Sequence, residues 1–436
     1  MNTAVSYDLS LSDAWAAGLA SLEIISANEA LRLHHALQRI GRDWPADSSP
    51  RYDELANLFT HLDAQLVSLM REDEDEQLAL DFLATRSATA RYLSVGRALL
   101  RAHAQHIVRA LNDVKHSLLT QAGKALSLRI IIPVNLSPAL AAQALVGWAY
   151  QFADMAEQLV AWRAHADRCP VTVGEGAGML FEQDPRPLAR ALDFSAVSSC
   201  AARELSSAAA SPEEERFFVL TGQVKALCRE FEQQVQLWKN VGFVKRAGNS
   251  EQVRSAQTSP AQGEPAQGEP ALPHDDSHAL IVKLTALAHM VERLEWDEPA
   301  CEKACSWKLA APDMVAWLVV HQHVRPALAE QVVLKFLEDR DTSSAQAESA
   351  EVAASRASEA PRTSESPSTS DAPSSKECEQ MLLAAGVAPA AMTGKLPVSA
   401  LKNLWSAAGS VEAHKSLGGS AAKRVDEQIK ELSTRR

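Results

Sequence analysis

Long amphipathic stretches constrain the fold of this chain more than any other feature of its sequence. Apolar residues recur at helical spacing from about Tyr92 to Leu119, from about Ala139 to Arg168, and again after Ser211. The first two stretches are about twice as long as an average helix. The third begins with Ser211-Pro212 and three glutamates, which is typical of a helix start because acids stabilise the positive end of the helix dipole. Clean β-branched alternation is rare, so the sequence predicts an all-α protein built around a bundle of long helices.

Two segments lack the large apolar side chains that a core requires. Residues 245–277 contain a tandem AQGEP repeat, and residues 341–377 consist mostly of Ser, Ala, Glu, Thr and Pro. Because such segments cannot offset the entropy lost on ordering, we predict that both are disordered linkers. The predicted division of the ordered chain is an N-terminal helical domain at 1–91, a central long-helix bundle at 92–244, a last bundle helix at 278–296, and a C-terminal helical domain in two parts at 297–340 and 378–436.

Charge and cysteine usage limit the class of partner and the compartment. The 436 residues include 43 Lys and Arg against 55 Asp and Glu, a formal net charge of −12, which disfavours binding to nucleic acid or to an anionic membrane. The longest apolar runs are far shorter than the roughly 20 residues that span a bilayer. The six cysteines have neither zinc-module spacing nor the density of a secreted scaffold. We therefore expect a soluble, cytoplasmic protein that binds neither nucleic acid nor membrane.

Two clusters of metal-ligating residue types are weak candidates. One lies at the end of the first linker, where nothing would pre-organise the ligands before the metal binds; it contains His274, Asp275, Asp276 and His278. The other is Cys301 and Cys305, which share a helical face but lack histidines at zinc spacing. We predict no metal site.

Several segments resemble argininosuccinate lyase, of the fumarase and aspartase superfamily, in the same order along the chain. They are SVEAHKSLGGSAAKRVDEQI at 410–429, AAPDMVAWLVV at 310–320, the segment at 170–194, the segment at 14–40, and WKNVGFV at 238–244. The resemblance implies the family's three-part helical lyase fold and its oligomeric assembly, in which three subunits build each active site. It also implies the family's reaction in arginine biosynthesis, a β-elimination that releases fumarate without a cofactor.

That reaction needs a base, groups that hold the developing charge on a carboxylate, and a loop that closes over the site. In the register of the resemblance, Ile131 and Ile132 stand where the family has its Thr-His pair, and a family histidine falls near Ala56. The linker at 245–277 replaces the reactive loop, and no register after Phe194 restores the family's Asn-Ser-Leu-Asp stretch. Neither isoleucine can transfer a proton or hold a carboxylate.

The family's GRSRNDQ segment corresponds to Thr85–Arg91. Arg86 and Ser87 are retained there, whereas Thr89 stands in place of the asparagine. Arg86 and Ser87 are the residual candidates for a substrate pocket, because a guanidinium and a hydroxyl together can hold a carboxylate. The alternative interpretation is a solvated arginine and a helix cap. We assign no catalytic residue.

The combined losses predict a lyase fold without lyase chemistry, a pseudoenzyme that acts by self-assembly or by association with an authentic lyase. The alternative is an active argininosuccinate lyase, or a related C–N lyase, with a rearranged site; a third possibility is a helical scaffold with regulated linkers. Association is expected because a bundle that lacks one long helix would expose an apolar groove. The residues expected to line that groove are Phe217, Phe218, Leu220 and Val224.

Overall fold

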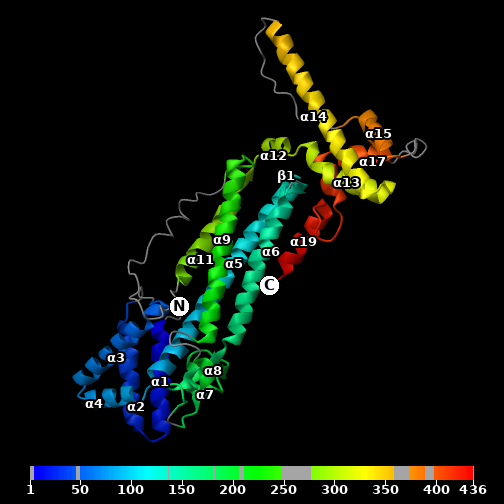
Figure 1. Ribbon diagram of the computed structural model, residues 1–436. Coiled ribbons are helices and arrows are strands. Elements are labelled where there is room, and N and C mark those ends of the chain that lie inside the picture. The colour runs from blue at the N-terminus through cyan, green and yellow to red at the C-terminus, as the bar shows by residue number, and fades with distance from the viewer. Residues whose placement is uncertain are drawn as a thin grey trace, which may run out of the picture. The chain divides into compact units, whose positions relative to one another are not determined.

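The computed structural model describes residues 4–45, 50–135, 137–179, 182–205, 211–246, 276–357, 373–387 and 397–435. Helices dominate this part of the chain, and its strands are only two to four residues long (Figure 1). The all-α class and the long-helix bundle are therefore confirmed. No helix of the described segments is both long enough and apolar enough to cross a membrane.

The chain divides into two compact units, each with its own set of elements. Unit 1 comprises 1–114, 151–230 and 249–288, and unit 2 comprises 115–150, 231–248 and 289–436. Four long helices contribute to both units: α5 (Ala88–Ser127), α6 (Ala141–His165), α9 (Pro212–Asn240) and α11 (Ser277–Glu292).

The remaining elements of unit 1 lie before α5 and between α6 and α9. They are α1 (Ala4–Ser21), α2 (Ala27–Asp43), the 3-10 helix η1 (Tyr52–Glu54), α3 (Leu55–Glu72), α4 (Glu76–Ala84), β3 (Arg168–Cys169), η2 (Val171–Val173), α7 (Pro185–Ala191), β4 (Ala196–Val197) and α8 (Ala201–Glu204). Helix α2 begins with a capping box, since the Ser26 hydroxyl accepts from Glu29 N and the Glu29 carboxylate accepts from Ser26 N. Strands β3 and β4 pair in parallel.

Unit 2 adds two short antiparallel strand pairs and the C-terminal helices. Its elements are β1 (Ile131–Val134), β2 (Ser137–Leu140), β5 (Val244–Arg246), β6 (Glu295–Trp296), α12 (Glu298–Ala304), η3 (Trp307–Ala310), α13 (Ala311–Gln322), α14 (Pro326–Ala357), α15 (Ser375–Ala384), α17 (Pro397–Leu404), α18 (Ala407–Ala413) and α19 (Ala422–Thr434). In the β1–β2 hairpin, Ile131 pairs with Leu140 and Val134 with Ser137. Strand β5 pairs with β6. The core of the C-terminal helices is centred on Trp405, which is fully buried.

The predicted linkers differ from the structure at their ends. Lys245 and Arg246 belong to β5, and α14 continues to Ala357, well inside the predicted second linker. Residues 341 to 357 include six alanines, and alanine has the highest intrinsic helix propensity. At their other ends, α11 begins at Ser277 and α15 at Ser375, inside the predicted linkers. Residues 247–275 and 358–372 lie outside the described residues.

Candidate functional site

Arg86 and Ser87 line a cavity of about 350 Å³ within unit 1. Helix α1 contributes Leu11 and Trp15 to the wall, and the start of α5 contributes Ala90 and Arg91. The opposite wall is the loop that follows η2, from Gly174 to Met179. Gly174 has a φ of +55°, and a side chain there would collide with the carbonyl oxygen of Gly178, so glycine is required for this tight loop.

The guanidinium groups beside this cavity are already paired with carboxylates of the same chain. Arg91 donates from Nε and Nη2 to the two oxygens of Asp8, each at 2.6 Å, and from Nη1 to both oxygens of Asp63 at 2.8 Å. Arg86 Nη2 lies 3.4 Å from Asp8 Oδ1. The Asp8 side chain is 1% exposed and that of Arg86 is 8% exposed. Arg86 is thus a buried partner of Asp8, and the interpretation of Arg86 as a solvated arginine is wrong.

Burial and ion pairing together shift the pKa values of Asp8, Arg86 and Arg91. Burial lowers the pKa of Arg86 to about 10, even though Asp8 opposes the shift. Burial would by itself raise the pKa of Asp8, but the guanidinium groups of Arg86 and Arg91 outweigh it and hold that pKa below its ordinary value. Arg91 shows the same balance, since its carboxylate partners raise its pKa against the effect of burial. All three groups are therefore charged at neutral pH, and they compensate one another.

Ser87 and Thr89 connect the start of α5 to the loop from Gly174 to Met179 through hydrogen bonds. The Ser87 hydroxyl donates to the carbonyl oxygen of Gly174 at 2.8 Å and accepts from Ala90 N at 3.0 Å, as an N-cap does. Thr89 Oγ1 donates to Glu175 Oε2 at 2.7 Å. Hydrogen bonds from Thr89 and Ser87 lower the pKa of Glu175. The helix-cap interpretation of Ser87 is therefore confirmed.

Few residues in the wall of this cavity could act as an acid, a base or a nucleophile. Glu175 is the carboxylate in its wall, and its lowered pKa makes it a weak base. The residues that line the cavity include no imidazole, thiol or amine. The charged residues of the wall are Arg86, Arg91 and Glu175, and Asp8 and Asp63, which do not line the cavity, compensate the two arginines.

The degenerate positions lie in three different environments. Ala56 is exposed on α3. Ile132 is 1% exposed in β1 and packs in the core. Ile131 lines a separate cavity of about 600 Å³ within unit 2. None of the three can exchange a proton, because all carry hydrocarbon side chains.

The expected apolar groove on α9 is not formed by the residues predicted for it. Phe217 and Val224 are fully buried, because α9 turns this side toward the core of the bundle. Phe218 is partly buried and stacks edge-on against Tyr52. The exposed apolar side chains of α9 are instead Val219, at 61%, and Leu237, at 53%.

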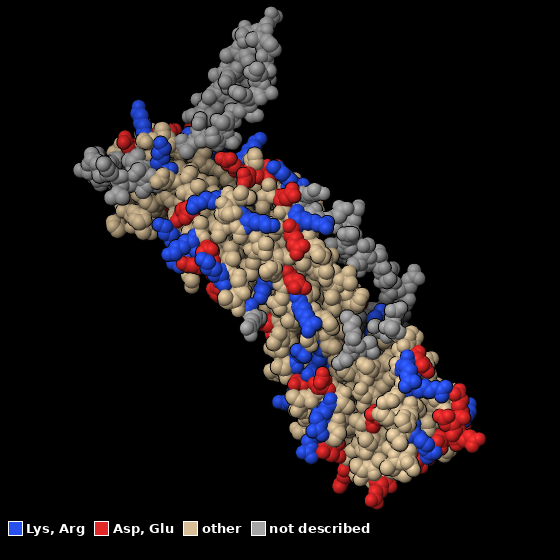
Figure 2. Space-filling view, turned by 180° about the vertical axis from the view of Figure 1, so that it is seen from behind, with Lys and Arg blue, Asp and Glu red and all other residues tan. Residues whose placement is uncertain are grey.

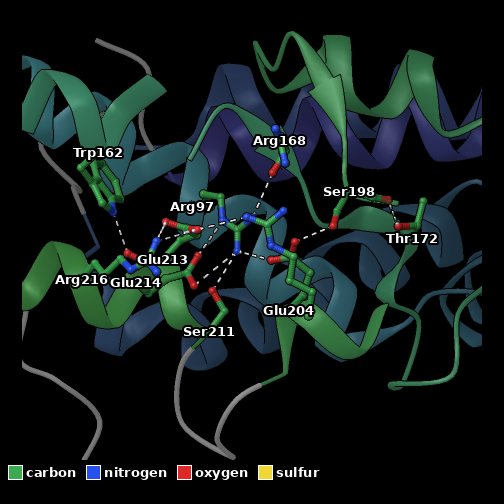
Figure 3. A network of polar contacts seen from close by, with 11 residues as sticks. Arg97, Trp162, Arg168, Thr172, Ser198, Glu204, Ser211, Glu213, Glu214 and Arg216 are labelled. Carbon is green, nitrogen blue, oxygen red and sulfur yellow. Dashed lines mark hydrogen bonds and ion pairs between the residues drawn. The ribbon is translucent and has the colours of Figure 1, made fainter. Parts of the chain in front are cut away.

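A second buried ion network, which the sequence patterns did not indicate, is centred on Arg97 of α5 (Figure 3). Arg97 donates from Nε to Glu214 at 2.9 Å and from Nη2 to Glu204 at 2.7 Å. It also donates to the Ser211 hydroxyl at 2.8 Å and to the carbonyl oxygen of Arg168 at 3.0 Å. Glu214 is one of the three glutamates interpreted as helix-start acids, so only its role at the dipole was predicted. The signal that could have exposed the network is an arginine on the apolar stripe of a long helix.

The metal clusters carry no site in the described part of the chain. His274 and Asp275 fall outside it, and Asp276 pairs with Lys225 at 2.8 Å. Across the described ranges, no group of three or more His, Cys, Asp or Glu side chains is placed to hold an ion. All six cysteines are free thiols.

Comparisons with known proteins define the class to which this fold belongs. No protein-family model matches the chain. The backbone is similar to that of EDDS lyase in complex with formate, with a TM-score of 0.72 and 14% identity over 99% of this chain and 86% of that one. It is also similar to fumarate lyase from Mesorhizobium sp. BNC1, with a TM-score of 0.61 and 13% identity over 98% and 95% of the two chains. The chain therefore shares the helical fold of these lyases.

The sequence adds a more particular relationship. The chain is 26% identical over 196 residues to argininosuccinate lyase of Bifidobacterium longum subsp. infantis, a match that covers 44% of this chain. The matched region spans only 39% of the length of that enzyme. Over this region the chain is similar to argininosuccinate lyase, in agreement with the resemblance noted in its sequence.

Proposed function

We propose that this chain is a pseudoenzyme of the lyase fold that acts by assembly, with copies of itself or with an authentic lyase. The observation that carries the proposal is the pairing of Arg91 and Arg86 with Asp8 and Asp63. The cations left beside the cavity are used inside the protein, so they are not free to hold the carboxylates of a substrate. The hydrocarbon side chains of Ile131 and Ile132 in place of the Thr-His pair support the same proposal.

The enzyme alternative is an active argininosuccinate lyase or related C–N lyase with a rearranged site. It would need a base other than Glu175 and a carboxylate-binding group other than the paired arginines. The sequence match to argininosuccinate lyase favours this alternative, because the matched protein is an enzyme. The electrostatics of the cavity argue against it.

We expect the purified chain to release no fumarate from argininosuccinate above a heat-inactivated control. Loss of a single donor to the developing negative charge commonly lowers kcat by about 10²- to 10³-fold, and here the base and the donors are missing together. The measurement is the absorbance of fumarate under saturating argininosuccinate, with an authentic lyase as the positive control. Saturable turnover that Glu175→Gln abolishes would contradict the proposal and favour the enzyme.

Assembly has its own test, because absence of activity alone does not establish it. Light scattering at micromolar concentration should give a mass well above 47.1 kDa. Acidic and basic side chains are mixed over the face drawn in Figure 2, with broad uncharged areas between them, as contact surfaces require. Val219→Asp with Leu237→Asp should lower the mass, because a charge would replace exposed apolar contacts of α9.

The matched control is Leu31→Asp on α2, a leucine that is 51% exposed, which should leave the mass unchanged. A monodisperse 47.1 kDa species that also fails to capture an authentic lyase in a pull-down would contradict the assembly role.

A further inference from the structure

A small basic cavity of about 190 Å³ lies within unit 1, away from the cavity that holds Arg86. Helix α5 supplies Arg101, His106 and Arg109 to its wall, and α6 supplies Arg163. The turn after α7 supplies Asp193. The two cavities share no lining residue, and their nearest lining residues on α5, Arg91 and Ala98, are seven positions apart, about 10 Å along the helix axis. The two cavities are therefore separate sites.

Cations outnumber carboxylates in this wall, although the whole chain carries a net charge of −12. Asp193 is the lining carboxylate, and Asp167 lies 2.6 Å from Arg101. Arg109 and Arg163 are exposed. Asp167, the partner of Arg101, is also attracted by Arg163, so Arg101 and Arg163 share one carboxylate. Three arginines thus face two carboxylates, and one positive charge is left over before His106 is counted.

Arg101 is held in place by several contacts, but one of its hydrogen-bond donors is unpaired among the described atoms. Its Nη1 donates to the carbonyl oxygen of Asp193 at 3.0 Å, its Nη2 pairs with Asp167, and its guanidinium stacks 4.5 Å from the centre of the Phe194 ring. The side chain is 11% exposed, and its Nε is buried without a hydrogen-bond partner among the described atoms. Buried donors are almost always satisfied, so an orphan donor beside a cavity indicates a missing acceptor. Burial lowers the pKa of Arg101, as expected for a cation without full compensation.

We propose that this cavity binds a small oxyanion of the phosphate class, held by Arg101, Arg109 and Arg163. Planar guanidinium groups bind phosphate oxygens through charge-assisted hydrogen bonds, and the volume admits a phosphate group with a short substituent. A bound dianion would neutralise the surplus positive charge of the wall. The inference does not depend on the proposed function, because it uses none of the residues of the first cavity.

The test is a calorimetric titration of the full chain with inorganic phosphate at fixed pH and low ionic strength. We expect saturable binding at one site per chain, and affinity at least about tenfold lower for Arg109→Gln/Arg163→Gln, because each substitution removes a charge-assisted contact. Both arginines are exposed, so the double variant should fold, which circular dichroism would verify. Titration with sodium chloride at the same ionic strength measures the nonspecific contribution.

The matched control is Arg229→Gln, because Arg229 is an exposed arginine of α9 that does not line the cavity. It should bind phosphate as the unmodified chain does.

A second arm uses glycerol phosphate. Tighter binding of the ester would assign the site to phosphorylated small molecules, and equal binding would assign it to free phosphate. Absence of saturable phosphate binding, or equal affinity of the double variant and the unmodified chain, would overturn the proposal.

Discussion

Arg97→Met should lower the free energy of unfolding by about 3–5 kcal/mol at neutral pH, because it leaves two buried carboxylates without their cation. The Arg97 side chain is 1% exposed, and those of Glu204 and Glu214 are 4% and 0% exposed. Equilibrium denaturation in urea, followed by helical circular dichroism, would measure the loss. The triple variant Arg97→Met/Glu204→Gln/Glu214→Gln should recover part of it, because no uncompensated charge then remains buried.

The stability loss caused by Arg97→Met should change with pH in a defined direction. Burial raises the pKa of Glu214 even against the pull of Arg97, and removal of Arg97 would raise it further. A carboxyl with a raised pKa in the folded state binds its proton more tightly when folded, so stability falls as the pH rises through that pKa. The loss caused by Arg97→Met should therefore be smaller at pH 5 than at pH 8. Equal losses at the two pH values would contradict an electrostatic origin.

An exposed ion pair provides the control for this experiment. Arg129 pairs with Glu412 at 3.2 Å, and its side chain is 68% exposed. Arg129→Met should change the free energy of unfolding by no more than about 1 kcal/mol, because water screens the pair in both states.

Trp405→Ala should lower the free energy of unfolding by about 3–5 kcal/mol through the cavity that it leaves. Trp405 is fully buried among the C-terminal helices of unit 2. Its ring centre lies 5.2 Å from that of Trp307 and 5.4 Å from that of Phe336, so the indole joins two other aromatic rings. Urea denaturation followed by tryptophan fluorescence and by circular dichroism would measure the loss.

Trp405→Phe separates ring volume from hydrogen bonding. The Trp405 Nε1 is buried without a hydrogen-bond partner among the described atoms, so phenylalanine removes an unsatisfied donor along with some volume. Its cost should be less than half that of alanine. The control is Leu417→Ala, since Leu417 is 95% exposed and its loss should change stability by less than about 0.5 kcal/mol. Equal losses for the alanine and phenylalanine variants would contradict a volume origin.

Local patterns were sufficient to predict the helices. The capping box at Ser26 and Glu29, the apolar stripe of α3 and the start of α9 at Pro212 are properties of residues three to eight positions apart. The resemblance to the lyases came from ordered segments, and the shared fold bears it out. That Ile131 and Ile132 replace the family's Thr-His pair stays a prediction from the register of the resemblance.

Pairing between distant residues could not be predicted in the same way. Asp8 and Arg91 are 83 positions apart, and Arg97 and Glu214 are 117 apart. Arg86 was expected to be solvated or to hold a carboxylate, and it is instead a buried partner of Asp8. Phe217 and Val224 were expected to be exposed, and they are buried. In each case the sequence did not reveal which helix packs against the residue in question.

The sequence by itself determined which segments are helical, because helix propensity and capping are local properties. Only the tertiary structure decided which charges compensate one another and which remain in surplus. Arg91 meets two carboxylates, whereas Arg101 and Arg163 share the single carboxylate of Asp167. The physical reason is that electrostatic energy depends on distance and burial in space, and the packing of distant helices sets both.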